Sequence, residues 1–527
     1  MERKFILLLL LITFSVPLSM SAQHQAWCAS TEMQQALIEE NPEIARALEN
    51  MEQIVSQKLP DTKNKSNQIV YNVPVVFHVI YNDKADNISK AQILDGLRVL
   101  NEDYRRLNPD TVNTRSIFKP VAADIGVEFK LATKDPDGNP TGGITRTQSA
   151  LSIDARDNVK SLISWDRTKY LNIWIVNSIE SSSSTAGITL GYAYFPQGAG
   201  QTTERDGIVI RHDALGTIGT ATYGGRTLSH EAGHYFSLHH TFNDGCNGGD
   251  NVDDTPPAAQ ANFGCNYNIN SCSNDSPDLV DQIENYMDYS DGVCQNMFTE
   301  GQKARIINSI SSFSLRGSLV ISSNLNATGV LNPVEVKPTA NLEADYYNIC
   351  AGSSVQFTDV HYDGTPTSYK WSFPGGTPST STDQNPSVTY GNSGSYDVTV
   401  IMTNAAGSDT LTINNAISVK RNVPAYAPTW AENFEGFGIP YPDVSIIDVS
   451  EDGIEFEVFG SAASDGGSQC LRLQNSETPV INGIDELYTP TFNTSAGGNL
   501  NFIFDVAFAK KSDNNTDQLK IYASKDC

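Results

Sequence analysis

Basic residues are scarce in this sequence. Its 527 residues include 35 lysines and arginines against 61 aspartates and glutamates, and no basic cluster interrupts the acidic excess. Nucleic acids and anionic membranes are attracted by such clusters, so both are disfavoured as partners, whereas cation binding fits the composition. The length exceeds what one hydrophobic core supports and predicts about three or four compact units.

A segment long enough to cross a membrane is also missing. The apolar run 5–18 follows Arg3 and Lys4 and ends near small residues at Ala22. It falls short of the ~20 residues that span a bilayer, and no later stretch is more apolar. The pattern predicts a signal peptide over 1–22, with a membrane anchor as the alternative. We therefore expect a secreted protein, extracellular or on the cell surface, without a membrane span.

Paired C-x-x-C motifs are absent from a cluster of four cysteines, which disfavours a zinc site made of four thiolates. In an exported protein such a cluster, flanked by Gly, Asn and Asp, is typical of two disulfides in a loop-rich segment. Four cysteines allow three pairings, and these residues alone leave the choice open. The four are Cys246, Cys265, Cys272 and Cys294.

Two kinds of segment precede these cysteines. Asn41 can cap a helix whose first residue is Pro42, and the polar segment 61–68 beyond it is expected to be an exposed linker that a protease can cut. An α/β domain is predicted from 68 to 315, with a capping box at Ser89 and Gln92. Its strands are expected at 69–80, 127–131, 171–176 and 207–211.

The residues that indicate chemistry lie between 227 and 242. His230 and His234 are four apart, so on a helix both imidazoles face one ion, and a turn beyond them can bring in His240. Three neutral imidazoles leave a fourth tetrahedral position for water, as in catalytic zinc sites. Glu231 is not a ligand and is expected to be the general base.

The remaining histidines are predicted to have other roles. His239 is expected to be a bystander beside the third ligand. Isolated histidines, such as His78, His212 and His361, are more often packed or surface residues than ligands.

The run from His230 to His240 resembles the extended zinc motif H-E-x-x-H-x-x-G-x-x-H of the metzincins, and 284–290 resembles their Met-turn. Together with 191–196 and 297–299, the region 69–310 resembles the bacterial branch of the pappalysin family. The resemblance implies an α/β metzincin domain, in which a twisted mixed sheet with helices precedes an irregular lower half. It also implies a zinc-dependent metalloendopeptidase.

The same resemblance assigns further roles. Met287 would form an apolar floor beneath the zinc, and Tyr289 would stabilise the oxyanion of the intermediate. By their residue types alone, Met287 is a core residue and Tyr289 a rim aromatic. The resemblance pairs Cys246 with Cys272 and Cys265 with Cys294.

Two positions depart from the family pattern. Ser237 replaces the motif's glycine, where the chain needs a left-handed turn; a non-glycine residue there costs about 1 kcal/mol, and we expect the turn to survive. Gly292 stands where relatives that cut before arginine carry an acidic residue, although Asp291 is adjacent. The preference after the cut is therefore left open.

The loop 249–256 offers carboxylates, a hydroxyl and carbonyls, which suit calcium. It resembles the family's calcium loop, whose ligands map onto Asp250, the carbonyl of Asp253, and Thr255. A solvated acidic turn is the alternative.

Cys28 lies in the predicted propeptide, 23–67. A thiolate binds zinc strongly, so Cys28 could occupy the fourth position and keep a zymogen silent until the propeptide is removed. The run 27–31 resembles the cysteine switch of some pappalysin relatives. A free thiol and a lipid anchor are the alternatives.

The C-terminal part is all-β in character. After a linker at 316–337, residues 338–421 resemble a PKD domain, an immunoglobulin-like sandwich with Trp371 and Tyr396 in its core. Residues 428–527 resemble an incomplete jelly-roll adhesion domain. The strands expected here are 355–357, 369–373, 396–400, 468–473, 500–509 and 519–523.

These observations predict a secreted, latent zinc endopeptidase that acts on proteins or peptides, with surface, carbohydrate or protein contacts through the β-domains. A catalytically inactive surface adhesion protein is the main alternative. A zinc hydrolase acting on non-peptide bonds is a third.

Overall fold

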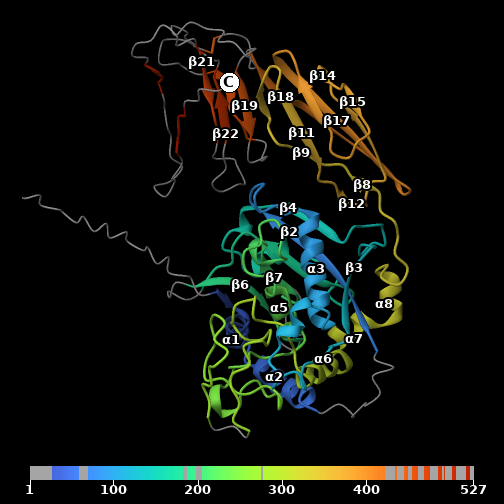
Figure 1. Ribbon diagram of the computed structural model, residues 1–527, viewed down its shortest axis with the longest axis vertical. Coiled ribbons are helices and arrows are strands. Elements are labelled where there is room, and N and C mark those ends of the chain that lie inside the picture. The colour runs from blue at the N-terminus through green and yellow to red at the C-terminus, as the bar shows by residue number, and fades with distance from the viewer. Residues whose placement is uncertain are drawn as a thin grey trace, which may run out of the picture.

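The computed structural model describes residues 26–57, 69–181, 187–196, 205–273 and 277–421, and short segments between 434 and 522 (Figure 1). The predicted signal peptide and the whole of the predicted cleavable linker, 61–68, lie outside the described residues, as do large parts of the last predicted domain. Within the described part of the chain, no helix combines the length and apolar character needed to cross a bilayer.

A seven-stranded mixed sheet forms the centre of the α/β domain. Its order is β1-β6-β7-β5-β2-β3, with β4 also paired to β2, and every pairing is parallel except that of β6 with β7. The long apolar run predicted as a strand is the central β2, whose middle residues are buried on both faces. The strands are β1 (Ala26–Cys28), β2 (Tyr71–Tyr81), β3 (Val127–Leu131), β4 (Ile144–Gln148), β5 (Leu171–Val176), β6 (Ile188–Ala193) and β7 (Ile208–Arg211).

Helices cover both faces of this sheet. Ile173 and Ile175 of β5 face a core shared with α3 (Lys90–Tyr104), α5 (Thr227–Tyr235) and α6 (Glu300–Ser312). Trp174, between them, faces the opposite side, where Leu37 of α1 (Ser30–Glu40) packs. The alternation along β5 therefore builds two cores, and an N-terminal helix completes the second.

Ser89 caps α3 by accepting a hydrogen bond from the backbone N–H of Gln92. The second hydrogen bond of the predicted capping box, from the backbone N–H of Ser89 to the side chain of Gln92, does not form. The Gln92 amide donates to the carbonyls of His212 and Leu215 instead. That side chain joins α3 to the loop after β7.

The predicted linker at 316–337 is also wrong in its first part. Two helices, α7 (Ser314–Val320) and α8 (Ser322–Ala327), follow α6. Arg316 and Leu319 are fully buried, and Arg316 pairs with Asp206. Because these side chains belong to the α/β core, the domain extends to Ala327.

The N-terminal segment consists of β1, α1 and α2 (Glu43–Val55). The second helix begins one residue later than predicted, at Glu43, with Pro42 at its N-cap position, although the side-chain oxygen of Asn41 does accept a hydrogen bond from the backbone N–H of Glu43. Met51 and Val55 of α2 are buried against Phe313 at the end of α6. The segment therefore packs on the α/β domain through two separate surfaces.

The predicted sandwich at 338–421 contains a five-stranded sheet, β10-β18-β17-β13-β15, and a four-stranded sheet, β14-β16-β11-β9. Trp371 is fully buried between them, as predicted, but Tyr396 is only half-buried, because its ring lies at the edge beside Gly375. The strands are β8 (Pro338–Thr339), β9 (Leu342–Ala344), β10 (Asn348–Cys350), β11 (Ser354–Asp359), β12 (Tyr362–Asp363), β13 (Ser368–Ser372), β14 (Gly376–Thr377), β15 (Thr380–Ser381), β16 (Ser387–Tyr390), β17 (Gly394–Asn404) and β18 (Gly407–Lys420).

Beyond residue 434 the described residues form two antiparallel pairs, β19 with β22 and β20 with β21. Residues 501–505 and 519–522 lie in predicted strands but are not paired in the structure. The jelly-roll assignment stays a prediction. The strands are β19 (Ser445–Asp448), β20 (Glu457–Gly460), β21 (Gln469–Arg472) and β22 (Asp485–Tyr488).

Candidate metal centre

His230 and His234 project from one face of α5, and both are buried. The Nδ1 of His230 lies 2.6 Å from the carbonyl of Tyr286, and that of His234 lies 2.7 Å from the carbonyl of Leu238. A carbonyl only accepts hydrogen bonds, so each Nδ1 carries the proton. Each Nε2 therefore presents a lone pair, which is the form that binds a metal.

His240 reaches the same point after a turn at Ser237. Ser237 has φ of 78°, the left-handed conformation predicted for this position. The turn is held from α6, where Arg305 donates to the carbonyl of Ser237 at 3.0 Å and Ser309 contacts the Ser237 hydroxyl at 3.1 Å. These buried contacts offset the cost of a side chain in this region.

The three Nε2 atoms converge. That of His240 lies 3.1 Å from Nε2 of His230 and 3.0 Å from Nε2 of His234, and the latter two are 3.1 Å apart. Two nitrogens on a tetrahedral zinc with bonds of ~2.0 Å lie ~3.3 Å apart. Burial lowers the pKa of His230 to about 4 and the pKa of the other two below their usual value, which favours the neutral form that binds a metal. This donor set fits a divalent cation.

Glu231 lies beside the histidines and is fully buried. Its Oε2 accepts hydrogen bonds from the Ser30 hydroxyl at 3.0 Å and the Cys28 thiol at 3.4 Å, while Oε1 is buried without a partner. Burial raises the pKa of Glu231 to about 8. Gly191 of β6 is needed here, because a Cβ would lie 2.9 Å from Cγ of Glu231.

Cys28 closes the remaining side of this group. The backbone of β1 pairs with β6 and places the Cys28 Sγ and one nitrogen of each of the three histidines within 4.8 Å of one another. Burial and the charge of Glu231 raise the pKa of the thiol; a bound cation would oppose both effects. Tyr289 donates its hydroxyl to the Cys28 carbonyl at 2.9 Å.

The 284–290 segment supports the histidines from below. Met287 is fully buried, and its Sδ lies 2.4 Å from where a Cβ on Gly233 would stand, so α5 needs glycine at this point. Asp103 accepts hydrogen bonds from the hydroxyls of Tyr286 at 2.8 Å and Ser229 at 2.5 Å. Sequence reasoning missed Asp103, since no local pattern links α3 to this segment.

Comparisons with known proteins agree with this arrangement. Residues 154–311 match the family described as pregnancy-associated plasma protein-A, and residues 341–417 match the PKD domain. An extracellular metalloprotease from Pyricularia oryzae is 37% identical over 235 residues, 44% of this chain and 70% of that protein. Extracellular metalloprotease 1 from Coccidioides posadasii is 33% identical, over 45% of this chain and 76% of its own length.

This chain belongs to the pappalysin family. It is a metallopeptidase with a PKD domain, and its relatives' names agree with the predicted export. A solved structure of mature mirolysin from Tannerella forsythia in complex with a cleaved peptide is 38% identical. Its match covers 50% of this chain and 99% of mirolysin, with a TM-score of 0.46.

The lower half of this pappalysin contains two disulfides, Cys246–Cys272 and Cys265–Cys294, which are the pairs implied by the family resemblance. They join parts of the loop-rich chain that follows His240, the second one reaching past the Met-turn segment to Cys294. The candidate calcium loop begins inside this region. Asp250 is buried with Oδ2 unpartnered, while its Oδ1 accepts from the backbone N–H of Val252 and from the Thr255 hydroxyl.

The predictions for the other histidines differ in outcome. His78 is buried between Thr145 and Asn172, with hydrogen bonds of 2.7 and 2.9 Å, as a packed residue should be. His212 and His361 are partly buried and bonded to neighbours within their own loops. His239 lies outside the histidine and cysteine group that could hold a metal, as predicted, but it contacts Glu52.

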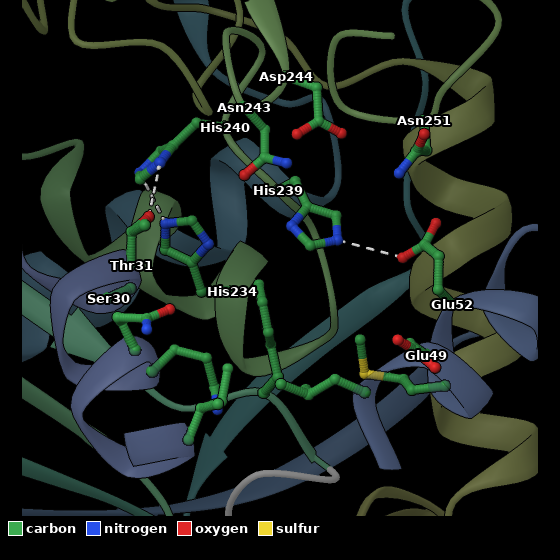
Figure 2. A pocket seen from close by; sticks show the side chains of 16 residues that line it. Ser30, Thr31, Glu49, Glu52, His234, His239, His240, Asn243, Asp244 and Asn251 are labelled. Atoms are coloured by element: carbon green, nitrogen blue, oxygen red, sulfur yellow. Dashed lines mark hydrogen bonds and ion pairs between the residues drawn. The ribbon is translucent and has the colours of Figure 1, made fainter. Parts of the chain in front are cut away.

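His239 belongs to a second polar cluster that sequence reasoning missed (Figure 2). Its Nε2 lies 3.1 Å from Oε2 of Glu52, which also pairs with Arg305 of α6. The sequence pattern could have indicated this cluster through Arg305, which shares a helical face with the buried Gln302 and Ile306. A charged residue on a buried face indicates a buried partner.

Gly292 faces Tyr223 and Gly224 with little free space. A Cβ there would lie 3.1 Å from the Tyr223 carbonyl and 3.4 Å from Cα of Gly224. An acidic side chain at this position would need the backbone to shift, which agrees with the departure from relatives that cut before arginine.

Proposed function

We propose that this pappalysin is a secreted zinc endopeptidase, made as a latent precursor, that hydrolyses peptide bonds in proteins or peptides. The observation that supports this most strongly is the convergence of three imidazole lone pairs next to the buried carboxylate of Glu231. His230, His234 and His240 would hold the ion. Zinc bound there would lower the pKa of a water toward ~7 and polarise the substrate carbonyl.

Glu231 is proposed as the general base. Burial raises the pKa of its carboxyl, which makes the ionised form a stronger base than an exposed carboxylate, and a cation bound beside it would favour that ionised form. It would then accept a proton from the attacking water and deliver it afterwards to the leaving amine. Tyr289 would donate a hydrogen bond to the oxyanion once its hydroxyl is released from the Cys28 carbonyl. Met287 would keep the floor of the site apolar and free of water.

The propeptide is proposed to enforce latency at this same place. Cys28 approaches the histidines, Ser30 occupies Glu231 through a 3.0 Å hydrogen bond, and the Cys28 carbonyl occupies Tyr289. Each group that the reaction needs is therefore bound by a residue of the 26–30 segment. Removal of the propeptide frees all of them together.

Cleavage of casein by the processed protein tests the proposed function. We expect cleavage that a chelator abolishes and that Glu231→Ala lowers by roughly 10²–10⁴-fold. Zinc content of the variant, measured in parallel, controls for loss of the ion, because Glu231 is not a ligand. Bound zinc without chelator-sensitive cleavage would favour the inactive adhesion protein, and activity only on esters or other non-peptide bonds would favour a non-peptide hydrolase.

Calcium is proposed as a second, structural ion, held by Asp250, the carbonyl of Asp253, and Thr255. The buried, unpartnered Oδ2 of Asp250 supports this, since burial raises the pKa of this carboxyl to about 7 and a bound cation would stabilise its charged form. Thermal unfolding with and without calcium checks it. We expect saturating calcium to raise Tm by roughly 5 °C, and Asp250→Asn to abolish the rise; an equal rise in both proteins would contradict the assignment.

A further inference from the structure

Glu52 is held by two cationic or hydrogen-bond-donating side chains of the protease domain. Its Oε1 lies 2.6 Å from Nη1 of Arg305, and its Oε2 lies 2.9 Å from Nη2 of Arg305 and 3.1 Å from Nε2 of His239. Figure 2 shows His239 pointing from the metal-site side of the cavity toward Glu52 on α2. Both carboxylate oxygens are therefore bound, in the forked geometry that arginine offers to carboxylates.

The two donors are fixed by the protease domain itself. Arg305 is anchored by its hydrogen bond to the carbonyl of Ser237, and only 3% of its side chain is exposed. The ring of His239 packs edge-on against Phe195, with the ring centres 4.9 Å apart. Loss of the propeptide removes Glu52 but none of these supports, so the donors keep their positions.

This cluster lies close to the metal centre. Phe195 contacts the ring of His234 as well as that of His239, and His239 precedes the proposed ligand His240. One cavity of about 350 Å³ is lined by Glu52, His239, His234 and His240 together. A peptide seated at the metal could therefore place a nearby group where the Glu52 carboxylate now lies.

Removing Glu52 leaves the Arg305 fork without a carboxylate. A buried guanidinium without its partner is unfavourable, and Arg305 Nε already has no hydrogen-bond partner. The vacated position selects for an anion of planar, two-oxygen shape. A neutral side chain does not offer two oxygens that share a negative charge.

We propose that Arg305 and His239 form a carboxylate subsite of the processed enzyme, which favours peptides with a carboxylate near the scissile bond. The carboxylate comes either from an acidic side chain or from the C-terminus of the peptide. This specificity rests on the proposed peptidase function, and Glu52 occupies the subsite in the precursor as a substrate carboxylate would.

Paired peptides test the subsite on the processed enzyme, which has lost the propeptide but keeps all residues after it. Glutamate is moved through the positions flanking the cut, each peptide is matched to its glutamine isostere, and short peptides are made with free and amidated C-termini. At one position, or at the C-terminus, we expect kcat/KM to be about tenfold or more higher for the charged member. Which series shows the difference identifies the source of the carboxylate.

Variants assign the preference to this cluster. Arg305→Gln should bring the charged-to-neutral ratio close to one, and His239→Gln should lower it partially. Arg305→Lys keeps the charge but loses the fork, so an intermediate ratio is expected. Lys303→Gln, which removes a charge from the same helix at its pair with Glu300, is the matched control and should keep the wild-type ratio.

Binding provides a second measurement that does not depend on turnover. The Glu231→Ala protein, processed by an added protease, should bind the charged peptide about tenfold more tightly than its isostere in fluorescence anisotropy. Equal kcat/KM and equal Kd within every pair would overturn the subsite while leaving the peptidase intact. That result would mean a carboxylate of the chain replaces Glu52; Asp250 already interacts with the charge of Arg305. Absence of all cleavage would instead contradict the proposed function, and the binding ratio would still decide the subsite.

Discussion

The propeptide contacts the protease domain in two places of different character. The 26–30 segment lies over the metal centre, where Cys28, Ser30 and a backbone carbonyl bind the groups that the reaction needs. Helix α2 lies farther along the cavity, where Glu52 pairs with Arg305 and His239. In the function proposed above, the first contact blocks chemistry, whereas the second holds the segment in place. Inhibition and attachment are therefore separable, and variants can break either one.

The largest effect is expected at the blocking contact. Cys28→Ala removes the thiol but keeps the pairing of β1 with β6 and the α2 contact. A tethered ligand acts at an effective concentration of about 1 mM, so its loss should raise the activity of the unprocessed precursor by roughly tenfold or more. Casein cleavage by precursor whose linker is protected from proteolysis measures this. Unchanged latency would show that Ser30 and the strand suffice without the thiol.

A smaller effect is expected at the attaching contact. Glu52→Gln keeps the shape but loses the charge that pairs with Arg305, at a cost of about 1–2 kcal/mol. The precursor should stay silent, because Cys28 is unchanged, but the cut propeptide should leave about tenfold faster. Size-exclusion chromatography at successive times after cleavage of the linker measures the rate at which the cut propeptide dissociates in solution. Glu49→Gln on the same helix is the control; activity of the uncut Glu52→Gln precursor would contradict the separation of the two contacts.

The attaching contact also predicts a pH dependence. Arg305 and His239 lower the pKa of Glu52 from 4.5 to about 2. A carboxyl whose pKa falls on docking stabilises the docked state fully above its free value and loses that contribution as pH falls toward 2. The cut propeptide should therefore loosen in acid between about pH 5 and 2, more steeply in wild type than in Glu52→Gln. Because histidine protonation affects both proteins, the difference between their curves is the measurement; identical curves would assign the loosening to the metal centre.

Sequence patterns predicted what depends on local spacing. His230 and His234 share a helical face by their separation alone, and the buried run of β2 is continuous because both faces of a central strand are covered. Strands β3 and β5 were predicted with the observed limits, because polar or glycine-containing segments bound each apolar run. The disulfide partners came from the family resemblance, and the role of Cys28 came from thiolate chemistry together with that resemblance.

Other features depend on contacts between distant segments. Glu52, His239 and Arg305 come from three parts of the chain, and nothing near any of them indicates the other two. Residues 316–320 of helix α7 were predicted as linker, and the burial of Arg316 becomes favourable only through Asp206. Buried ion pairs of this kind cancel the polarity on which sequence patterns rely.

The smallest effect is expected at Ser237, where the chain departs from the family glycine. Ser237→Gly relieves about 1 kcal/mol of strain at φ 78° but loses the contact with Ser309 and adds entropy to the unfolded chain. The change in unfolding free energy should therefore stay within about 1 kcal/mol. Ser237→Ala keeps the strain and loses the hydrogen bond, so it should destabilise by about 1–2 kcal/mol. Chemical denaturation of the two variants side by side measures their unfolding free energies. A glycine variant less stable than the alanine variant would mean that the serine hydroxyl is not what maintains this turn.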